Sequence, residues 1–346
     1  MSVEVATYQN ALHARGVAKL WQRVFGESTG GQDVAWLFRA NPAGECVRVV
    51  AVENGQVVGH AGTFPVRFRC LGQPVRGAYS VAAMTEASQR GRGVYRAMGE
   101  ALYAALEAQD YAFVAGFSNA NSHRLMTGPL GRVPLRPFPW CVKLLGTGGA
   151  LRCLTRRPLS GSFTQAPAPL EGSAVEVRAC SLDEPAIEAV WKAVEAEVGV
   201  GAVRDVAFSR WRYLSRGDAG YRAALASSGG KAVAFCVYRL LPVRGVPACF
   251  LMDLQVAPKH EDAGEELLRW AEGHARRCGA GVMSALLPSR GTAAAVLQRS
   301  RYLRIPERLH PQTIRFSVRG LGEMAGCRQL SDASAWTLGW SDTDVV

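Results

Sequence analysis

The sequence lacks the features that mark several protein classes. Its nine cysteines stand singly, their number is odd, and no Cys-x-x-Cys pair occurs. This pattern argues against a disulfide framework and against a zinc site, so we expect free thiols, no metal and a cytoplasmic protein. No apolar run approaches the roughly 20 residues of a membrane-spanning helix. The N-terminus has the acidic Glu4 and no apolar signal-peptide core.

The charge of the chain is unbalanced but not concentrated. Lysine and arginine number 40 against 29 acidic residues, which gives a formal net charge of +11. A positive balance favours a polyanionic partner: nucleic acid, an acidic carrier protein, a membrane surface or a phosphate-rich cofactor. No block consists of lysine and arginine alone, so we do not expect nucleic-acid binding. The 48% hydrophobic content predicts a packed core.

The most informative stretch is residues 85–95. It follows a strand expected to end near Met84 and precedes an expected amphipathic helix. Between them, residues 90–93 read Arg-Gly-Arg-Gly. Glycine has no Cβ and lets backbone N–H groups converge, and a helix N-terminus adds partial positive charge. The sequence therefore predicts a site for a phosphate or pyrophosphate, with Arg90 and Arg92 at its rim.

This order of strand, basic glycine turn and helix resembles the pyrophosphate-binding turn of the GCN5-related N-acetyltransferases, the GNAT superfamily. Residues 83–93 are similar to the pattern Val-Ala-Thr-x-Pro-x-x-Arg-Gly-x-Gly of its two-domain members. Ala87 replaces the usual proline, and Tyr95 stands where the turn often has a small residue. A Rossmann fingerprint is excluded because the third glycine is missing, and a P-loop because no Gly-Lys-Ser/Thr follows.

The resemblance implies acetyl-CoA or a longer acyl-CoA as co-substrate. The turn would hold the pyrophosphate, while the end of the preceding strand would pair with the pantetheine arm and polarise the thioester oxygen. Family members often contact the pantetheine or the 3′-phosphate end through an asparagine after the next strand, which Asn119 or Asn121 fits. Ser122 would cap the helix there. The cofactor-binding residues expected on this basis are Ala83, Met84, Thr85, Arg90, Gly91, Arg92, Gly93, Val94, Tyr95, Asn119, Asn121 and Ser122.

Two residues are candidates for proton transfer in the implied reaction, where the amine attacks directly and no acyl-enzyme forms. An alkylamine has a pKa of about 10.4 and must lose a proton first. Glu86 could accept it directly or through water, or be a solvated loop acid. His123 could act as base or acid, or be a hydrogen-bonded structural residue. The tyrosine that protonates the thiolate in many family members is absent, because its position falls on Met126 or Thr127.

The chain also repeats its own pattern. Residues 33–44 resemble residues 208–220, and after each come a strand pair, a turn, a strand, a helix and a strand. This predicts an α/β fold of two tandem GNAT-like domains, each a mixed, mostly antiparallel sheet flanked by helices. The expected boundaries are 1–145 for the cofactor-binding acyltransferase domain, 146–173 for a linker rich in Ser, Pro and Ala, 174–320 for a degenerate GNAT-like domain, and 321–346 for a C-terminal tail.

The second copy has lost the cofactor turn. Within residues 256–264, Glu261 and Asp262 stand where the first copy has arginine and glycine. A like charge beside a diphosphate costs on the order of 1 kcal/mol or more near a surface. We therefore expect the N-terminal half to bind the cofactor and the C-terminal half to shape the acceptor site.

The C-terminal tail allows two interpretations. Asp342, Asp344 or the Val346 carboxylate could contact a cationic amine, or the tail could simply dock through Trp336 and Trp340.

These features together predict an N-acyltransferase that moves an acyl group from acyl-CoA to a small-molecule amine acceptor. The alternatives are an acyl carrier protein as donor, an aminoacyl-tRNA-dependent transferase of the Fem type, and a catalytically silent acyl-CoA-binding protein. The intact turn speaks against the Fem type, which lacks it.

Overall fold

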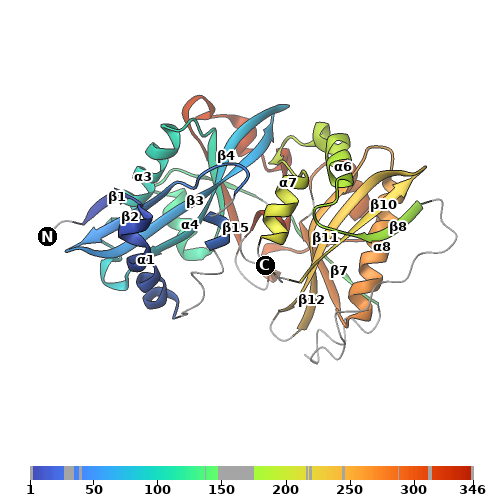
Figure 1. The fold of residues 1–346 in the computed structure, drawn as a ribbon, viewed down its shortest axis with the longest axis horizontal. Coiled ribbons are helices and arrows are strands. Elements are labelled where there is room, and N and C mark those ends of the chain that lie inside the picture. Colours follow the sequence, from blue (N-terminus) through green and yellow to red (C-terminus); the bar gives the residue numbers. More distant parts are fainter. Residues whose placement is uncertain are drawn as a thin grey trace. The chain divides into compact units, whose positions relative to one another are not determined.

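The computed structural model describes residues 3–26, 35–38, 41–136, 138–146, 175–215, 217, 220–243, 246–286, 288–310 and 314–343. The chain divides into two compact units (Figure 1). Unit 1 comprises Met1–Phe68, Gln73–Phe138 and Gln312–Asp332, and unit 2 comprises Arg69–Gly72, Pro139–Pro311 and Ala333–Val346. The expected linker, from residue 147 onward, lies outside the described residues.

Unit 1 is built on a mixed sheet with the strand order β1-β2-β3-β4-β5-β15-β6. Strands β4 and β5 run parallel, whereas the β1–β2, β2–β3, β5–β15 and β15–β6 pairs are antiparallel. The strands are β1 (Glu4–Thr7), β2 (Arg48–Glu53), β3 (Gln56–Cys70), β4 (Gln73–Thr85), β5 (Phe113–Ser118), β6 (Val133–Leu135) and β15 (Arg315–Gly320). The helices are α1 (Asn10–Phe25), η1 (Ala35–Phe38), η2 (Ala87–Gln89), α3 (Val94–Glu107), α4 (Ala120–Thr127), η6 (Gly322–Met324) and η7 (Arg328–Ser331).

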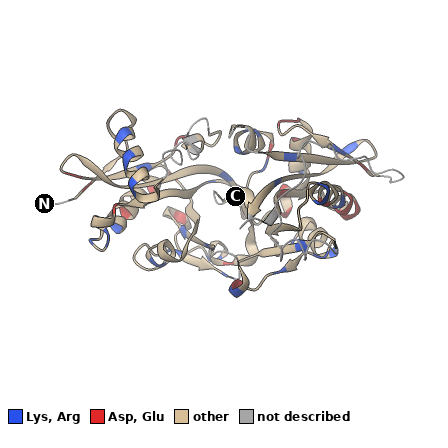
Figure 2. Cartoon of the chain, turned by 90° about the horizontal axis from the view of Figure 1, so that it is seen from below, with Lys and Arg blue, Asp and Glu red and all other residues tan. Residues whose placement is uncertain are grey.

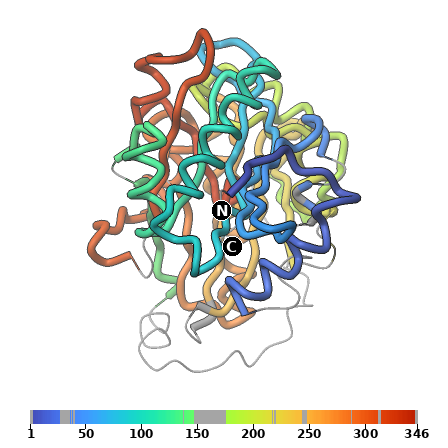
Figure 3. Tube along the Cα trace, turned by 90° about the vertical axis from the view of Figure 1, so that its left-hand side faces the viewer, coloured from blue at the N-terminus to red at the C-terminus, as the bar shows by residue number. Residues whose placement is uncertain are grey.

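Helices α1 and α3 cover opposite faces of this sheet (Figure 3). The expected apolar stripe of α3, which includes Met98, packs in one cluster with Val49 of β2. Leu20 of α1 packs in another cluster with Val50, the next residue of the same strand. Successive side chains of a strand point to opposite faces, so the two helices lie on the two sides of β2.

Unit 2 has the strand order β14-β7-β13-β12-β11-β10-β8. Its strands are β7 (Trp140–Leu144), β8 (Val175–Cys180), β9 (Val200–Ala202), β10 (Tyr221–Ser228), β11 (Lys231–Val243), β12 (Val246–Val256), β13 (Val282–Leu286), β14 (Leu303–Arg304) and β16 (Trp336–Thr337). Its helices are α6 (Ala186–Val194), η3 (Glu195–Glu197), α7 (Val206–Ser209), the π-helical η4 (Arg210–Leu214), α8 (Glu261–Arg277), α9 (Thr292–Arg299), η5 (Glu307–Leu309), η8 (Ala333–Ala335) and η9 (Trp340–Asp342).

The two units share one topology, which confirms the predicted fold class. In unit 1, α3 connects the parallel strands β4 and β5; in unit 2, α8 connects the parallel strands β12 and β13. Each unit is therefore a mixed sheet with helices against it. Basic residues are spread over elements of both units (Figure 2).

Neither unit is the contiguous range that the sequence suggests. Strand β7 lies within the expected first domain but pairs with β13 of unit 2. Strand β15 lies within the expected second domain but pairs with β5 of unit 1. The edge of a strand such as β5 must be paired or covered, and here the partner comes from about 200 residues away in sequence, as the bond from Ser118 to Arg315 shows. Local sequence patterns carry no information on such distant pairing.

Candidate functional site

The parallel strands β4 and β5 separate before β4 ends. Their register covers Gly77↔Phe113, Ala78↔Val114 and Tyr79↔Ala115. Beyond it, β4 runs on to Thr85, and Ala82 has a φ of 53°, which is uncommon for alanine. The β4–β5 ladder therefore stops before Ala82, and the end of β4 is not paired with β5.

The residues expected to meet the cofactor at this strand end differ in exposure. Ala83 and Thr85 are half-buried. Met84 is buried in the cluster that contains Leu20 of α1, so its side chain belongs to the core and only its backbone faces are open to a ligand.

The turn after β4 is open where a phosphate would sit. Gly91 and Gly93 both have a φ of 79°, and a methyl group at either position would meet no atom within 4 Å. The Ala97 N–H donates to the Gly93 carbonyl at 3.0 Å and begins the helical ladder of α3. The N–H groups of Val94 and Tyr95 precede it and have no acceptor within the helix. Open space in front of such donors suits an anion.

The two arginines of the turn have different surroundings. Arg92 donates to Gln89 at 2.7 Å and pairs with Glu53 at 3.4 Å, and the buried Gln89 donates to the same carboxylate at 2.6 Å. The exposed Arg90 donates to the Thr85 carbonyl at 3.4 Å and forms no ion pair with a described carboxylate. Arg90 is therefore the more available of the two for a phosphate.

The helix start behind the turn is anchored in the core. Val94 is buried, and the half-buried Tyr95 packs against the same cluster as α3. Burial raises the pKa of Tyr95 to about 12. The ring of Tyr95 thus fills the core side of the helix, which explains how a bulky residue is compatible with this turn.

The asparagine region opens helix α4, but its cap differs from the prediction. The Asn119 Oδ1 atom accepts hydrogen bonds from the Asn121 and Ser122 N–H groups, each at 3.0 Å. The expectation that Ser122 caps the helix is wrong, because the chain is still extended at Asn119 and its side chain occupies the N-cap position. Asn121 is exposed and Ser122 half-buried.

His123 is buried at the end of β5. Its Nδ1 lies 3.2 Å from the Ser118 Oγ, which donates to the Arg315 carbonyl at 3.2 Å. Because the Ser118 proton is engaged there, Nδ1–H of His123 is assigned as the donor to Ser118, and Nε2 keeps its lone pair. Burial and the nearby Arg315 and Arg136 lower the pKa of His123. The imidazole is therefore neutral at pH 7.

Glu86 is bound by an arginine. The two carboxylate oxygens of Glu86 lie 3.1 Å from Nε and 3.2 Å from Nη2 of Arg23 on α1. Arg23 also donates to the Val57 carbonyl at 3.1 Å. This bidentate pair ties α1 to the end of β4, and a proton acceptor role for Glu86 requires the pair to open.

The structure adds His60, which the sequence analysis did not single out. His60 is 1% exposed, and its Nδ1 donates to the Ala82 carbonyl at 2.7 Å. Its Nε2 accepts from the Arg48 Nε at 3.2 Å. Burial lowers the pKa of His60 to about 4. The sequence could have pointed to His60 as a single histidine within an apolar strand. Its hydrogen bond to Ala82 could not be predicted, because it forms only where β4 bends.

Unit 2 keeps the strand separation without the anion site. Strands β12 and β13 pair over Ala248↔Val282 to Phe250↔Ser284, after which β12 runs on to Val256. A cavity of about 70 Å³, lined by residues such as Trp191, Gln255 and Leu338, lies there. Acidic residues occupy the first turn of α8, which disfavours an anion.

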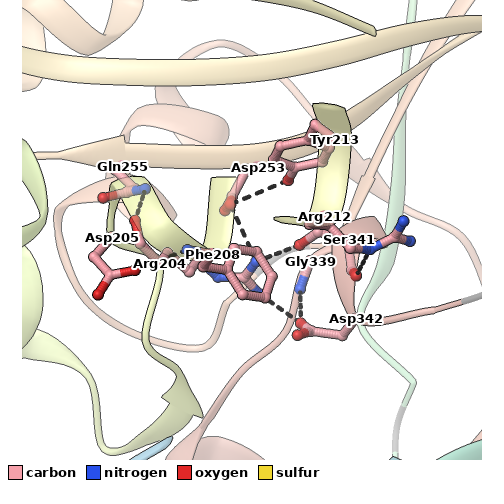
Figure 4. Close-up of polar contacts among 10 residues, drawn as sticks. All are labelled: Arg204, Asp205, Phe208, Arg212, Tyr213, Asp253, Gln255, Gly339, Ser341 and Asp342. Carbon is pink, nitrogen blue, oxygen red and sulfur yellow. Dashed lines mark hydrogen bonds and ion pairs between the residues drawn. The ribbon is translucent and has the colours of Figure 1, made fainter. Parts of the chain in front are cut away.

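The C-terminal tail is held in unit 2 by buried polar contacts (Figure 4). Asp342 lies 2.5 Å from Arg204 and accepts from the Gly339 N–H at 2.8 Å, while Arg204 also pairs with Asp253 at 3.1 Å. Burial raises the pKa of Asp253. Asp342 is ion-paired with Arg204, and Trp340 is fully buried. These contacts favour the interpretation that the tail docks through its tryptophans over a contact of Asp342 with an amine. Asp344 and Val346 lie outside the described residues.

Comparison with known proteins agrees with this geometry. Residues 8–124 match the acetyltransferase (GNAT) domain family, a range that contains the separated strand and the turn. No curated protein matches the sequence.

Solved structures resemble the chain over most of its length. A GCN5-related N-acetyltransferase from Anabaena variabilis ATCC 29413 shares 13% identity with a TM-score of 0.62, over 95% of this chain and 74% of that one. A second from Kribbella flavida shares 15% identity with a TM-score of 0.59, over 92% and 71%. The Saccharomyces cerevisiae N-myristoyltransferase, solved with bound myristoyl-CoA, shares 11% identity with a TM-score of 0.57, over 92% and 79%. At these identities the likeness establishes the fold.

Two features are absent from the described residues, a membrane-spanning helix and a metal-binding cluster. None of their helices combines the length and the apolar character that a membrane crossing requires. Within the same described ranges, no group of three or more His, Cys, Asp or Glu side chains could hold a metal ion.

Proposed function

We propose that the chain, whose residues 8–124 match the acetyltransferase (GNAT) domain family, is an acyltransferase that transfers an acyl group from acyl-CoA to an amine, with the cofactor in unit 1. The observation that carries this proposal is the conjunction of a separated β4 end and an open glycine turn at the start of α3. Unit 2 has the first feature without the second.

The cofactor would lie along the end of β4 with its phosphates at the turn. The N–H groups of Gly93, Val94 and Tyr95 and the side chain of Arg90 would bind the pyrophosphate. The backbone of Ala83 and Thr85 would pair with the pantetheine amides and polarise the thioester oxygen. Asn121 would contact the cofactor from α4, while Asn119 keeps its cap role.

The chemistry follows from these positions. The amine nitrogen attacks the thioester carbon, the C–N bond forms, and the C–S bond breaks to release the CoA thiolate. The amine proton passes to a base, for which neutral His123 is the better placed candidate because Glu86 is bound by Arg23. A thiol has a pKa near 8.5, so the thiolate leaves without a dedicated acid. In this proposal the missing tyrosine does not abolish turnover.

A carrier-protein donor is the second candidate. Helix α1 carries Arg15, Lys19 and Arg23 at intervals of four residues, and these line a cavity of about 500 Å³. Residues four apart lie on one helix face, so this basic row would suit an acidic protein.

The first experiment is a thermal-shift titration with acetyl-CoA, medium- and long-chain acyl-CoA and free CoA. We expect acyl-CoA to stabilise the wild type and not Gly93→Glu, because the new carboxylate would occupy the phosphate position. Gly326→Glu is the matched control: its φ is 77°, against 79° for Gly93, and it also faces open space. Both variants carry the same backbone strain and charge change.

No stabilisation of the wild type by any CoA species would contradict a CoA-dependent reaction and favour a carrier-protein donor. An equal loss of the ligand shift in both glycine variants would contradict the assignment of the turn.

A further inference from the structure

Arg48, the first residue of β2, is held flat between two aromatic rings. Its guanidinium carbon lies 3.6 Å from the ring centroid of Tyr8 and 4.3 Å from that of Phe38. The side chain is half-buried. Stacking of this kind fixes the plane of the guanidinium and keeps it charged.

The guanidinium hydrogen-bonds with two partners, His60 and the Tyr8 side chain, while its remaining outer N–H groups are available to a ligand. Nε donates to the His60 Nε2 at 3.2 Å, and the Nη groups carry the other donors. No carboxylate of the described residues forms an ion pair with Arg48, in contrast to Arg23, Arg92 and Arg204. Burial lowers the pKa of Arg48, which reflects the cost of its poorly solvated charge. A half-buried arginine in this condition is suited to an anionic ligand.

The position of Arg48 relates it to the proposed reaction centre. His60 connects it to the Ala82 carbonyl, at the bend of β4 beyond its pairing with β5. His60 lies directly opposite Val50 in the β2–β3 pair, and Val50 packs against α1. Arg48 is two residues from Val50 and so shares the face of α1.

Helix α3, whose N-terminus would hold the pyrophosphate, packs on the opposite face through Val49. Arg48 is thus linked through His60 to the end of β4, where the proposed thioester would lie, and it is on the opposite face of the sheet from the phosphate turn. A cationic group there would suit the acceptor rather than the cofactor phosphates.

We propose that Arg48 binds a carboxylate carried by the amine acceptor, so that the acceptor belongs to the amino-acid class; this rests on the proposed acyl transfer in unit 1. The paired Nη groups match the two oxygens of a carboxylate. Tyr8 and Phe38 restrict the guanidinium through their ring faces. His60 holds Arg48 in register with the bend of β4.

The test compares amino acids with the same amines lacking the carboxylate. The pairs are phenylalanine and 2-phenylethylamine, lysine and cadaverine, histidine and histamine, and serine and ethanolamine, with phosphoethanolamine as an alternative anion. Binding is measured by calorimetry on the full chain saturated with free CoA. We expect at least one amino acid to bind tenfold or more tightly than its partner amine.

The variants assign that preference to Arg48. Arg48→Gln should reduce it to less than twofold, and Arg48→Lys should keep part of it. Arg328→Gln, which removes an exposed arginine elsewhere in unit 1, should leave it unchanged. Affinity for acyl-CoA should stay within twofold in all three variants, which also shows that unit 1 remains folded.

Three results would overturn the inference: equal binding within every pair, tighter binding of phosphoethanolamine than of any amino acid, or an equal loss of both pair members in Arg48→Gln. Acyl-CoA binding is read separately. Its absence from the wild type contradicts the proposed function, whatever the amine series shows.

Discussion

His60 joins Arg48 of β2 to Ala82 of β4 through its two ring nitrogens. Its two ring nitrogens have opposite roles, since Nδ1 donates to Ala82 and Nε2 accepts from Arg48. Only the neutral imidazole can do both. Protonation would place a second cation beside Arg48 and remove the acceptor, so this arrangement depends on pH.

The sign of that dependence follows from the pKa. Burial lowers the pKa of His60 from 6.5 to about 4. Between these values the unfolded chain binds a proton that the folded chain does not, so stability falls as pH falls. We expect the free energy of unfolding to drop by about 1.6 kcal/mol from pH 6.5 to pH 5 through His60 alone. Urea unfolding at the two pH values measures it.

His60→Asn should flatten this slope, and His13→Asn, on α1, should not. His123, whose pKa is also lowered, keeps a smaller slope in the His60 variant. An unchanged slope in His60→Asn would show that His60 is not the titrating group.

At the scale of elements, helices α3 and α4 differ in whether their first backbone N–H groups are capped by a side chain. Helix α3 begins after a glycine with a left-handed backbone and no side-chain cap, so no cap side chain takes up its first donors. Helix α4 begins after Asn119, whose side chain takes up two of the donors. One helix start is therefore open for a ligand and the other is closed by the protein itself.

The cap of α4 gives a direct test. Asn119→Ala should lower the free energy of unfolding by about 1 kcal/mol, because two backbone donors lose their acceptor. Ser122→Ala should change it by less than about 0.5 kcal/mol. Urea unfolding at pH 7 compares them, and a larger effect of Ser122→Ala would contradict the assigned cap.

The sequence predicted the elements that are determined by neighbouring residues in the chain. The glycine turn could be predicted because the glycines and arginines of residues 90–93 themselves supply the backbone flexibility and the charge. Helix α3 could be predicted because its apolar residues recur at helical spacing. Ser122 was assigned as cap because the helix start was placed a few residues late. The contact of His60 with Ala82 was out of reach, since it joins two strands through a bend that only the folded sheet imposes.

At the scale of the molecule, each sheet needs a strand from a distant part of the chain. Strand β5 pairs with β15 over Phe113–Ser118 and Arg315–Gly320. Strand β13 pairs with β7 over Val282–Leu286 and Trp140–Leu144. The domain boundary that the sequence suggests, at residue 145, therefore does not coincide with the limits of either unit.

A fragment of residues 1–145 should not fold by itself. It lacks β15, so the edges of β5 and β6 would be exposed. We expect weak ellipticity and aggregation of this fragment in circular dichroism and gel filtration, and partial recovery when a peptide of residues 312–332 is added. A monomeric, cooperatively unfolding fragment would contradict the need for β15.

The position of β15 in the sequence also determines when unit 1 can finish folding during translation. Most strands of unit 1 are synthesised well before β15, so the sheet is complete only after residue 320 has emerged. At about 5–20 residues per second, the N-terminal segment waits roughly 10–40 s for its last strand. A chain that terminates early therefore never completes the unit that would bind the cofactor. The proposed acyl-transfer site would form only in molecules translated past residue 320.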